Sequence, residues 1–216
     1  MANSAVVIVG RPNDDPLGPT GTVGVCAEKS RKLVVLVDAG DPWNGNELLE
    51  RLGQLEMKDA VTHVVITHGH LDHCANMGLF STATHIMDAD IGMRRNGEAC
   101  KYSVVPHWPY QISDNIEIMK LSGHTASDTI VICRERSRTV VFSGDLVEDA
   151  KDFANFQNSL PDLGFGCEND DEELILSQEY IFSSGDLIVP GHGSPFANDF
   201  RSYFLFFSFW RRFMIL

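Results

Sequence analysis

Short hydrophobic runs separated by polar segments recur along the whole chain. The runs have the length and β-branched content of strands, and they cover residues 5–9, 33–37, 61–66, 83–87, 116–121, 129–133, 139–142 and 187–190. Leucines at helical spacing predict a helix over 47–55, with a helix or turn at 76–80 and a further helix at 172–180. Strands with helices between them predict an α+β fold, in which two mixed sheets carry outer helices and loops at one sheet edge assemble a site.

The segments between these runs are predicted to be turns and loops. Residues 11–24 are rich in Pro, Gly and Asp, and the charged residues 134–138 form a hairpin turn. Residues 102–110 fit an exposed strand or a loop facing the site, and we favour edge packing for their aromatic side chains. Residues 148–173 are polar and then strongly acidic, as expected of a solvated connection over the surface.

The composition is that of a globular protein without an electrostatic bias toward nucleic acid. The 216 residues suffice for one large domain or two small ones, and the formal net charge is -13 at pH 7. Neutralising phosphates requires clustered Lys and Arg, so a large non-specific surface for nucleic acid is disfavoured. A local basic patch is still compatible with this composition.

The cysteines and the N-terminus indicate where the protein resides. The five cysteines are widely spaced and contain no Cys-x-x-Cys pair, which indicates a reducing compartment rather than a disulfide framework. The N-terminus has neither the basic region nor the long hydrophobic region of a secretory signal. We therefore expect an intracellular protein of the cytoplasm, the nucleus or both.

Potential metal ligands are concentrated in residues 67–73, directly after a predicted strand. His68, His70, Asp72 and His73 lie within six residues, although the chain has only 8 histidines in 216 residues. Neutral imidazole and carboxylate are common ligands of zinc. A tight loop allows the first two imidazoles to face one ion, which leaves Asp72 and His73 free to reach a second ion.

Other predicted strands also end in His or Asp. His124, Asp145 and His192 each follow a strand and each adjoin a glycine, which permits close approach of the backbone to a metal or substrate. Asp38 follows the strand over 33–37, and the sequence leaves two interpretations open for it. Its carboxylate either caps a turn or holds a nearby metal ligand in orientation without binding the metal itself.

Together these side chains suit a centre of two divalent cations. Two such ions share a water, lower its pKa from about 15.7 towards about 7, and stabilise negative charge on a carbonyl or phosphoryl oxygen. Imidazole combined with carboxylate favours zinc, and iron or manganese is also compatible. Cys74 adjoins the cluster but is interpreted as a small packed hydrophobe, and His63, His85 and His107 fall outside the pattern.

The order and spacing of these motifs resemble the metallo-beta-lactamase superfamily over nearly the whole chain, from about residue 34 to residue 196. The resemblance implies an αββα sandwich with a two-metal site at the sheet edge. It also implies the metal ligands, which are His68, His70 and His124 on one ion, Asp72, His73 and His192 on the other, and Asp145 bridging both. Asp72 and Asp145 are the carboxylates expected to take part in catalysis.

Further stretches at 36–43, 67–80 and 190–196 are similar to a small subgroup close to the glyoxalase II branch. For that subgroup the resemblance implies an endoribonuclease acting at the 3′ end of replication-dependent histone pre-mRNA. Only 46 residues separate Asp145 from His192, without the large insert of dedicated RNA-processing relatives, so contacts to RNA must come from the core loops.

Two alternative functions remain compatible with the sequence. A thioester or ester hydrolase of the glyoxalase II type is supported by the acidic charge and by the missing insert. A catalytically inactive binding module on the same fold is the third class, and the complete ligand set argues against it.

The expected partners follow from these alternatives. They are an RNA substrate (histone pre-mRNA) or a small thioester, with no DNA sequence readout and no transmembrane span, and a homodimer is left open. The resemblance ends at Phe196, which divides the chain into a metallo-beta-lactamase-like domain over 1–196 and an aromatic-rich C-terminal tail over 197–216. The hydrophobic run of the tail is shorter than the about 20 residues that cross a bilayer as a helix, and we expect it to have no catalytic role.

Overall fold

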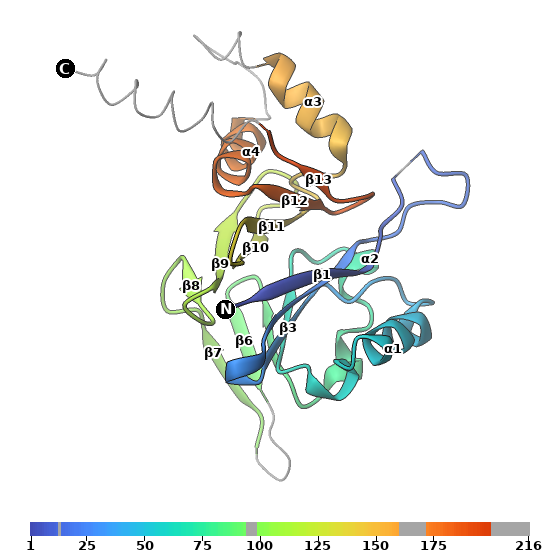
Figure 1. Cartoon of the computed structure of the whole chain (residues 1–216), viewed down its shortest axis with the longest axis vertical. Coiled ribbons are helices and arrows are strands. Elements are labelled where there is room, and N and C mark those ends of the chain that lie inside the picture. The colour runs from blue at the N-terminus through green and yellow to red at the C-terminus, as the bar shows by residue number, and fades with distance from the viewer. Residues whose placement is uncertain (13, 94–98, 160–171, 200–216) are drawn as a thin grey trace, which may run out of the picture.

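Two β-sheets pack face to face and helices cover their outer faces, in the layer order α–β–β–α (Figure 1). The computed structural model describes residues 1–12, 14–93, 99–159 and 172–199. This arrangement confirms the α+β fold of two sheets with outer helices that the hydrophobic pattern predicts, and the αββα sandwich that the resemblance implies.

The first sheet has seven strands in the order β1-β2-β3-β4-β5-β6-β7. Its strands are β1 (Asn3–Ile8), β2 (Val23–Glu28), β3 (Leu33–Val37), β4 (His63–Ile66), β5 (Thr84–Met87), β6 (Asp90–Met93) and β7 (Lys101–Val104). The strands β3, β4 and β5 pair in parallel, whereas the other neighbours pair antiparallel. The C-terminal ends of β3 and β4 therefore lie side by side at one edge of the sandwich.

The second sheet has six strands in the order β13-β12-β11-β10-β9-β8. Its strands are β8 (Tyr110–Gln111), β9 (Ile116–Leu121), β10 (Asp128–Arg134), β11 (Thr139–Gly144), β12 (Leu187–Pro190) and β13 (Phe196–Ala197). The strands β11 and β12 pair in parallel, and Gly144 is opposite Pro190 at their ends. The loops that follow these two strands consequently start next to each other.

The helices are α1 (Gly45–Gln54), α2 (Leu71–Cys74), α3 (Ala150–Ser159) and α4 (Glu172–Ser184), with 3-10 turns η1 (Lys29–Arg31), η2 (Lys58–Ala60) and η3 (Met77–Phe80). Helix α1 covers the first sheet through Leu48 and Leu52, which lie one turn apart and are fully buried. Helix α4 covers the second sheet through Ile181 and Phe182. Each such side chain contributes about 1.5–3 kcal/mol of stability by leaving water, and the two helices lie on opposite sides of the sheets (Figure 1).

The strand β3 explains why the chain forms three hydrophobic layers. All five of its residues are buried, as expected of a parallel strand covered on both faces. Val35 and Val37 pack between the two sheets, whereas Val34 and Leu36 point the other way and pack under α1. Because side chains alternate along a strand, one uninterrupted hydrophobic run joins two cores.

The strand β2 and the helix α3 are not among the elements that the sequence predicts. The strand β2 lies between the loop at 11–24 and β3 and is buried at every position, but its small residues give a weak hydrophobic signal. The helix α3 occupies part of the segment 148–173 that was predicted to be a surface connection. The acidic residues 168–171 and the tail from residue 200 lie outside the described residues.

No helix in the described ranges is long and apolar enough to cross a membrane.

Candidate metal centre

Seven His and Asp side chains from both sheets meet at one edge of the sandwich. They lie directly after four strands: His68, His70, Asp72 and His73 after β4, His124 after β9, Asp145 after β11, and His192 after β12. The two sheets are joined beside these loops, because the amide of Thr129 donates to the carbonyl oxygen of Thr67 at 2.8 Å. The strands β11 and β12 pair in parallel, and β9 is separated from β11 by one antiparallel strand, so the loops after these three strands start at the same edge of the second sheet.

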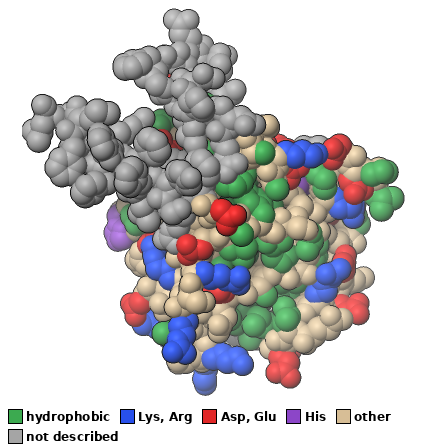
Figure 2. Space-filling model, turned by 45° about the horizontal axis from the view of Figure 1, so that its top comes forward, with side chains coloured by type: hydrophobic (Ala, Val, Ile, Leu, Met, Phe, Trp, Pro, Cys, Tyr) green, Lys and Arg blue, Asp and Glu red, His purple; other side chains and the backbone are tan. Residues whose placement is uncertain are grey.

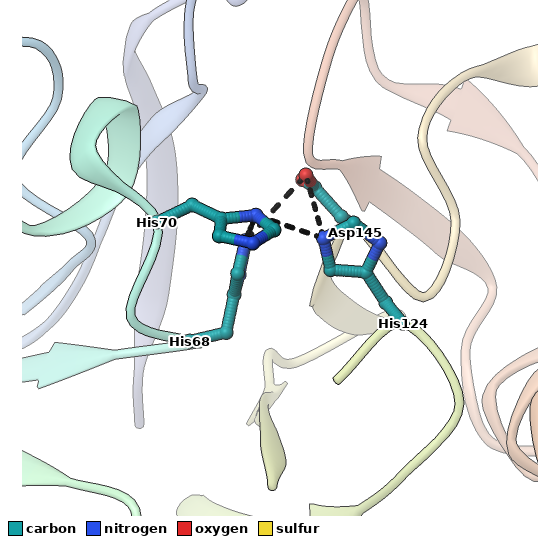
Figure 3. Close-up of side chains that lie close together, drawn as sticks. All are labelled: His68, His70, His124 and Asp145. Carbon is teal, nitrogen blue, oxygen red and sulfur yellow. Dashed lines mark hydrogen bonds and ion pairs between the residues drawn. The ribbon is translucent and has the colours of Figure 1, made fainter. Parts of the chain in front are cut away.

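The first group consists of His68, His70, His124 and Asp145. Nδ1 of His70 lies 2.9 Å from Nε2 of His68 and 3.0 Å from Nε2 of His124. Oδ2 of Asp145 lies 3.5 Å from Nε2 of His68 and 3.4 Å from Nε2 of His124. Figure 3 shows these side chains turned toward one another from opposite sides of the site, and one donor atom from each lies within 4.8 Å of all the others.

The second group consists of Asp72, His73 and His192. Oδ2 of Asp72 lies 3.7 Å from Nε2 of His73 and 3.7 Å from Nε2 of His192. Asp145 belongs to this group as well as to the first, because its Oδ1 lies 3.1 Å from Nε2 of His73 and its Oδ2 lies 3.3 Å from Nε2 of His192. The carboxylate of Asp145 thus stands between two sets of potential ligands.

A second layer of hydrogen bonds fixes the orientation of the imidazoles. Nδ1 of His73 donates to Oδ2 of the buried Asp38 at 2.8 Å, and Asp38 also accepts from the amide of Thr67 at 2.7 Å and its hydroxyl at 2.9 Å. Nδ1 of His192 donates to the carbonyl oxygens of Arg11 and Thr20 at 3.0 and 2.9 Å. In both histidines the bonded Nδ1 leaves Nε2 facing the site, as metal-ligating histidines require.

The carboxylates in the cluster favour positive charge on the groups beside them. Burial disfavours the charged imidazole of His73, but the carboxylates of Asp38 and Asp145 outweigh burial and raise its pKa to about 11. Burial and the charge of His73 lower the pKa of His68 to about 3. Burial also opposes ionisation of Asp145, but its contacts with His192 and His73 hold its pKa well below the usual range.

The donor set fits divalent metal ions. Nε2 of His73 and Oδ1 of Asp145 are buried and have no hydrogen-bond partner among the described residues, although they lie 3.1 Å apart. A shared cation would satisfy both atoms, since buried polar atoms rarely remain unpaired. Imidazole nitrogens with carboxylate oxygens are ligands of zinc, iron and manganese.

Glycine at position 191 gives Asp145 the space it occupies. A Cβ on Gly191 would lie 1.9 Å from Oδ1 of Asp145 and 2.9 Å from its backbone nitrogen. We expect Gly191→Ala to displace Asp145 and to lower zinc affinity and hydrolysis by at least about tenfold, as loss of support for a ligand does. Gly78→Ala is the matched control, because nothing lies within 4 Å of its added Cβ. Equal zinc binding by the two variants would show that the position of Asp145 does not matter.

The centre opens into a cavity of about 580 Å³. Its wall combines residues of the loop after β1 with residues of the loops after β3 and β4, namely Arg11, Leu17, Gly18, Pro19, Asp41, Pro42, Trp43, Leu71 and Asp72, and it also includes His70, His124, Asp145, Glu148 and His192. Sequence reasoning did not predict Arg11, Asp41 or Trp43 at the site. The one available signal was the position of Asp41 and Trp43 directly after a buried strand.

The remaining candidates lie apart from the two groups. Cys74 is half-buried and packs against the hydrophobic core between α1 and the first sheet. His63 contacts the hydroxyl of Thr62, and Nε2 of His85 the carbonyl oxygen of Phe80. The exposed His107 contacts the carbonyl oxygen of Pro109.

The class of protein is shown by sequence comparison as well as by the fold. The profile of the metallo-beta-lactamase superfamily matches residues 25–89. Metallo-beta-lactamase domain-containing protein 1 of Xenopus laevis is 36% identical over 168 residues, which cover 76% of this chain and 68% of the relative. The chain belongs to the metallo-beta-lactamase superfamily, as the spacing of its motifs predicts, and this membership implies a metal-dependent hydrolase.

Other relatives have the same name or the same fold. Metallo-beta-lactamase domain-containing protein 1 of Homo sapiens is 30% identical over 186 residues, covering 85% of this chain and 66% of the relative. The chain thus spans about two thirds of the length of both relatives. Among solved structures, a Thermotoga maritima protein assigned to the metallo-beta-lactamases superposes with a TM-score of 0.64 at 17% identity, covering 91% of this chain and 99% of that chain. The MIM-2 metallo-beta-lactamase superposes with a TM-score of 0.53 at 17% identity, covering 86% and 74%.

Proposed function

We propose that this chain is a binuclear metal-dependent hydrolase that cleaves phosphodiester bonds of RNA, with histone pre-mRNA as the substrate that the family resemblance implies. The observation that carries the hydrolase is the position of Asp145. Its carboxylate contacts His68 and His124 of the first group at 3.5 and 3.4 Å, and His73 and His192 of the second group at 3.1 and 3.3 Å. Such a carboxylate is placed to join two ions in one centre.

Each ligand has a defined role in the proposal. His68, His70 and His124 would hold one ion, Asp72, His73 and His192 would hold the other, and Asp145, which contacts both groups, would be shared between them. When bound, two divalent ions lower the pKa of a coordinated water and stabilise the negative charge that develops on the oxygen under attack. Zinc is the ion that this donor set favours.

Two aspartates outside the shared position have distinct roles, one in proton transfer and one in positioning a histidine. Asp72 is the most accessible of the carboxylates in the two groups, with 26% of its side chain exposed against 5% for Asp145. It faces the cavity and is therefore placed to accept the proton of the attacking water. Asp38 acts through His73, whose ring it holds in place.

An RNA substrate is supported by the wall of the cavity. Arg11 and the exposed Trp43 line it beside the metal ligands, and unstacked bases of single-stranded RNA are bound by aromatic stacking together with cations.

The proposed location is the cytoplasm or the nucleus. The described cysteines form no disulfide, in agreement with a reducing, intracellular compartment.

Hydrolysis of a small thioester is the second candidate, and a specific observation favours it. Among the described residues that line the cavity, Arg11 is the one arginine or lysine, whereas Asp41, Asp72, Asp145 and Glu148 are acidic. On the face in Figure 2, Lys and Arg side chains are interspersed with Asp and Glu and form no continuous basic patch. A long polyanion gains little affinity from such a surface.

Two substrates separate the candidates. The zinc-loaded chain is assayed with a single-stranded RNA fragment from a histone pre-mRNA 3′ end and with S-lactoylglutathione, each with and without a chelator. We expect zinc-dependent cleavage of the RNA and little turnover of the thioester. Cleavage of the thioester alone would overturn the RNA proposal, and hydrolysis of neither substrate would overturn the proposed hydrolase.

A further inference from the structure

The indole of Trp43 stands exposed at the meeting point of two cavities. It lies just before α1 and is 79% exposed, although a side chain of this size normally leaves water. Trp43 lines the metal-site cavity of about 580 Å³ and also an adjacent cavity of about 340 Å³. Arg11 and Asp41 line both cavities too, so these three side chains form one shared wall beside the metal centre.

The backbone under Trp43 is held firmly in place. Nδ2 of Asn76 donates to the carbonyl oxygen of Ala39 at 2.9 Å and also to that of Asp41. The amide of Asn44 donates to the carbonyl oxygen of Asp41 at 3.2 Å, which closes a turn around Trp43. The exposed indole therefore stands on a fixed turn, and a ligand that stacks on it orders little additional backbone.

Arg11 is held in a defined place opposite this turn. The amides and carbonyl oxygens of Arg11 and Thr20 pair with each other at 3.0 and 3.2 Å, and Nε of Arg11 donates to the carbonyl oxygen of Gly18 at 2.9 Å. The amide of Gly193 donates to the carbonyl oxygen of Gly10 at 2.9 Å, which ties this loop to the strand end that carries His192. The guanidinium is thereby held at the cavity wall within the same frame as the metal ligands.

Asp41 supplies an acceptor without a partner. Its residue is only 3% exposed, and its Oδ2 is buried with no hydrogen-bond partner among the described residues. A buried carboxylate oxygen is costly to leave unpaired. Because Asp41 lines both cavities, its carboxylate is placed beside a bound molecule whose N–H or O–H donor would give this oxygen a partner.

We propose that Trp43, Arg11 and Asp41 form a nucleotide subsite beside the metal centre. Trp43 stacks on one unpaired base, Arg11 contacts a phosphate, and Asp41 accepts a hydrogen bond from the base or the ribose. The subsite rests on the proposed RNA hydrolase and specifies how that enzyme selects its substrate. An aromatic face, a cation and a polar acceptor are the groups that single-stranded RNA requires.

Binding of adenosine monophosphate tests the subsite separately from catalysis. The affinity of the zinc-loaded full chain for adenosine monophosphate and for ribose 5-phosphate is measured by calorimetry. The two probes carry the same phosphate and ribose, so the difference between them reports the base. We expect adenosine monophosphate to bind at least about tenfold more tightly, as a stacked base does.

Variants assign this difference to individual side chains. Trp43→Ala is expected to reduce the preference for adenosine monophosphate to near one, whereas Trp43→Phe retains most of it. Asp41→Ala is expected to weaken the binding of adenosine monophosphate several-fold, because the acceptor of one hydrogen bond is removed. Tyr102→Ala is the matched control, since Tyr102 is 82% exposed on β7 away from both cavities.

The outcomes distinguish the subsite from the proposed reaction. Equal binding of the two probes, or an unchanged preference in Trp43→Ala, would overturn the subsite even if RNA is cleaved. A Trp43-dependent preference in a chain that cleaves no RNA would retain the subsite and overturn the proposed substrate. If Tyr102→Ala reduced the preference for adenosine monophosphate as much as Trp43→Ala does, the loss of preference would not be specific to the subsite.

Discussion

The substitution Asp145→Asn is expected to remove most of the hydrolysis while the fold survives. The amide has nearly the shape of the carboxylate, but it has one oxygen fewer and no negative charge, so it cannot bridge two cations. Each metal ion supplies several kcal/mol of transition-state stabilisation. With a tenfold change in rate for each 1.36 kcal/mol, turnover is expected to fall on the order of 10²–10⁴-fold.

The measurement is the initial rate of RNA hydrolysis at saturating zinc, together with a thermal unfolding curve. Asp59→Asn is the matched control, because Asp59 is an exposed residue in η2. Activity close to that of the unaltered chain in Asp145→Asn would mean that Asp145 does not join two ions. Loss of activity together with loss of the unfolding transition would instead indicate a structural role.

The second large effect is the contrast between Asp72→Ala and Asp38→Ala. Asp72 is part-exposed and lies 3.7 Å from two imidazole nitrogens, so its removal deletes a proposed ligand and the proposed proton acceptor. Asp38 is buried and holds His73 and Thr67. We expect Asp72→Ala to cost far more activity than Asp38→Ala, by at least about tenfold, since loss of a supporting residue costs about 10–100-fold in metal affinity and added metal compensates for it.

The stability of these two variants is expected to change in the opposite order. Removing Asp38 leaves buried donors of His73 and Thr67 unpaired, at a cost of about 1–3 kcal/mol for each unsatisfied group. Asp38 also has a positive φ of 62°, which alanine adopts less readily than aspartate. Asp38→Ala should therefore unfold at a lower temperature, whereas Asp72→Ala should not. Comparable loss of activity in both variants at saturating zinc would contradict the separate roles.

The sequence predicts the elements with uninterrupted hydrophobic runs best. The strands β3, β9 and β12 have the bounds that their hydrophobic runs predict, because residues buried on two faces leave a strong local signal. The strand β2 carries Gly24 and small residues instead, and its burial depends on Phe142 from the other sheet, which lies against Gly24. A contact between residues so distant in sequence leaves no local pattern.

The helix α3 was missed for a related reason. Its sequence is mostly polar, and the signal was restricted to Phe153 and Phe156, which lie three residues apart. Both rings pack on Phe182 of α4, at centroid distances of 4.8 and 5.0 Å. The partner helix is remote in sequence, so the pair of aromatic residues is recognisable as a helical face only once the two helices are seen together.

The residues of the site also divide into those that the sequence predicts and those that it does not. The histidines and aspartates are predicted from the dense loop at 68–73 and from the family resemblance, and their positions after strands support a common edge. The wall of the cavity is not predicted, because Arg11 and Trp43 belong to different loops, one held by the hydrogen bonds of Arg11 with Thr20 and the other by those of Asn76 with Ala39 and Asp41. Loop contacts of this kind depend on the completed fold and have no periodic pattern in the sequence.

The number of zinc ions bound to each chain decides whether the cluster is a two-metal centre. The full chain is saturated with zinc, freed of excess metal, and measured by mass spectrometry under conditions that preserve the fold. The geometry of the two groups around Asp145 predicts a mass increase of two zinc ions. A chain that retains one zinc ion or none would contradict the binuclear centre from which the proposed hydrolysis follows.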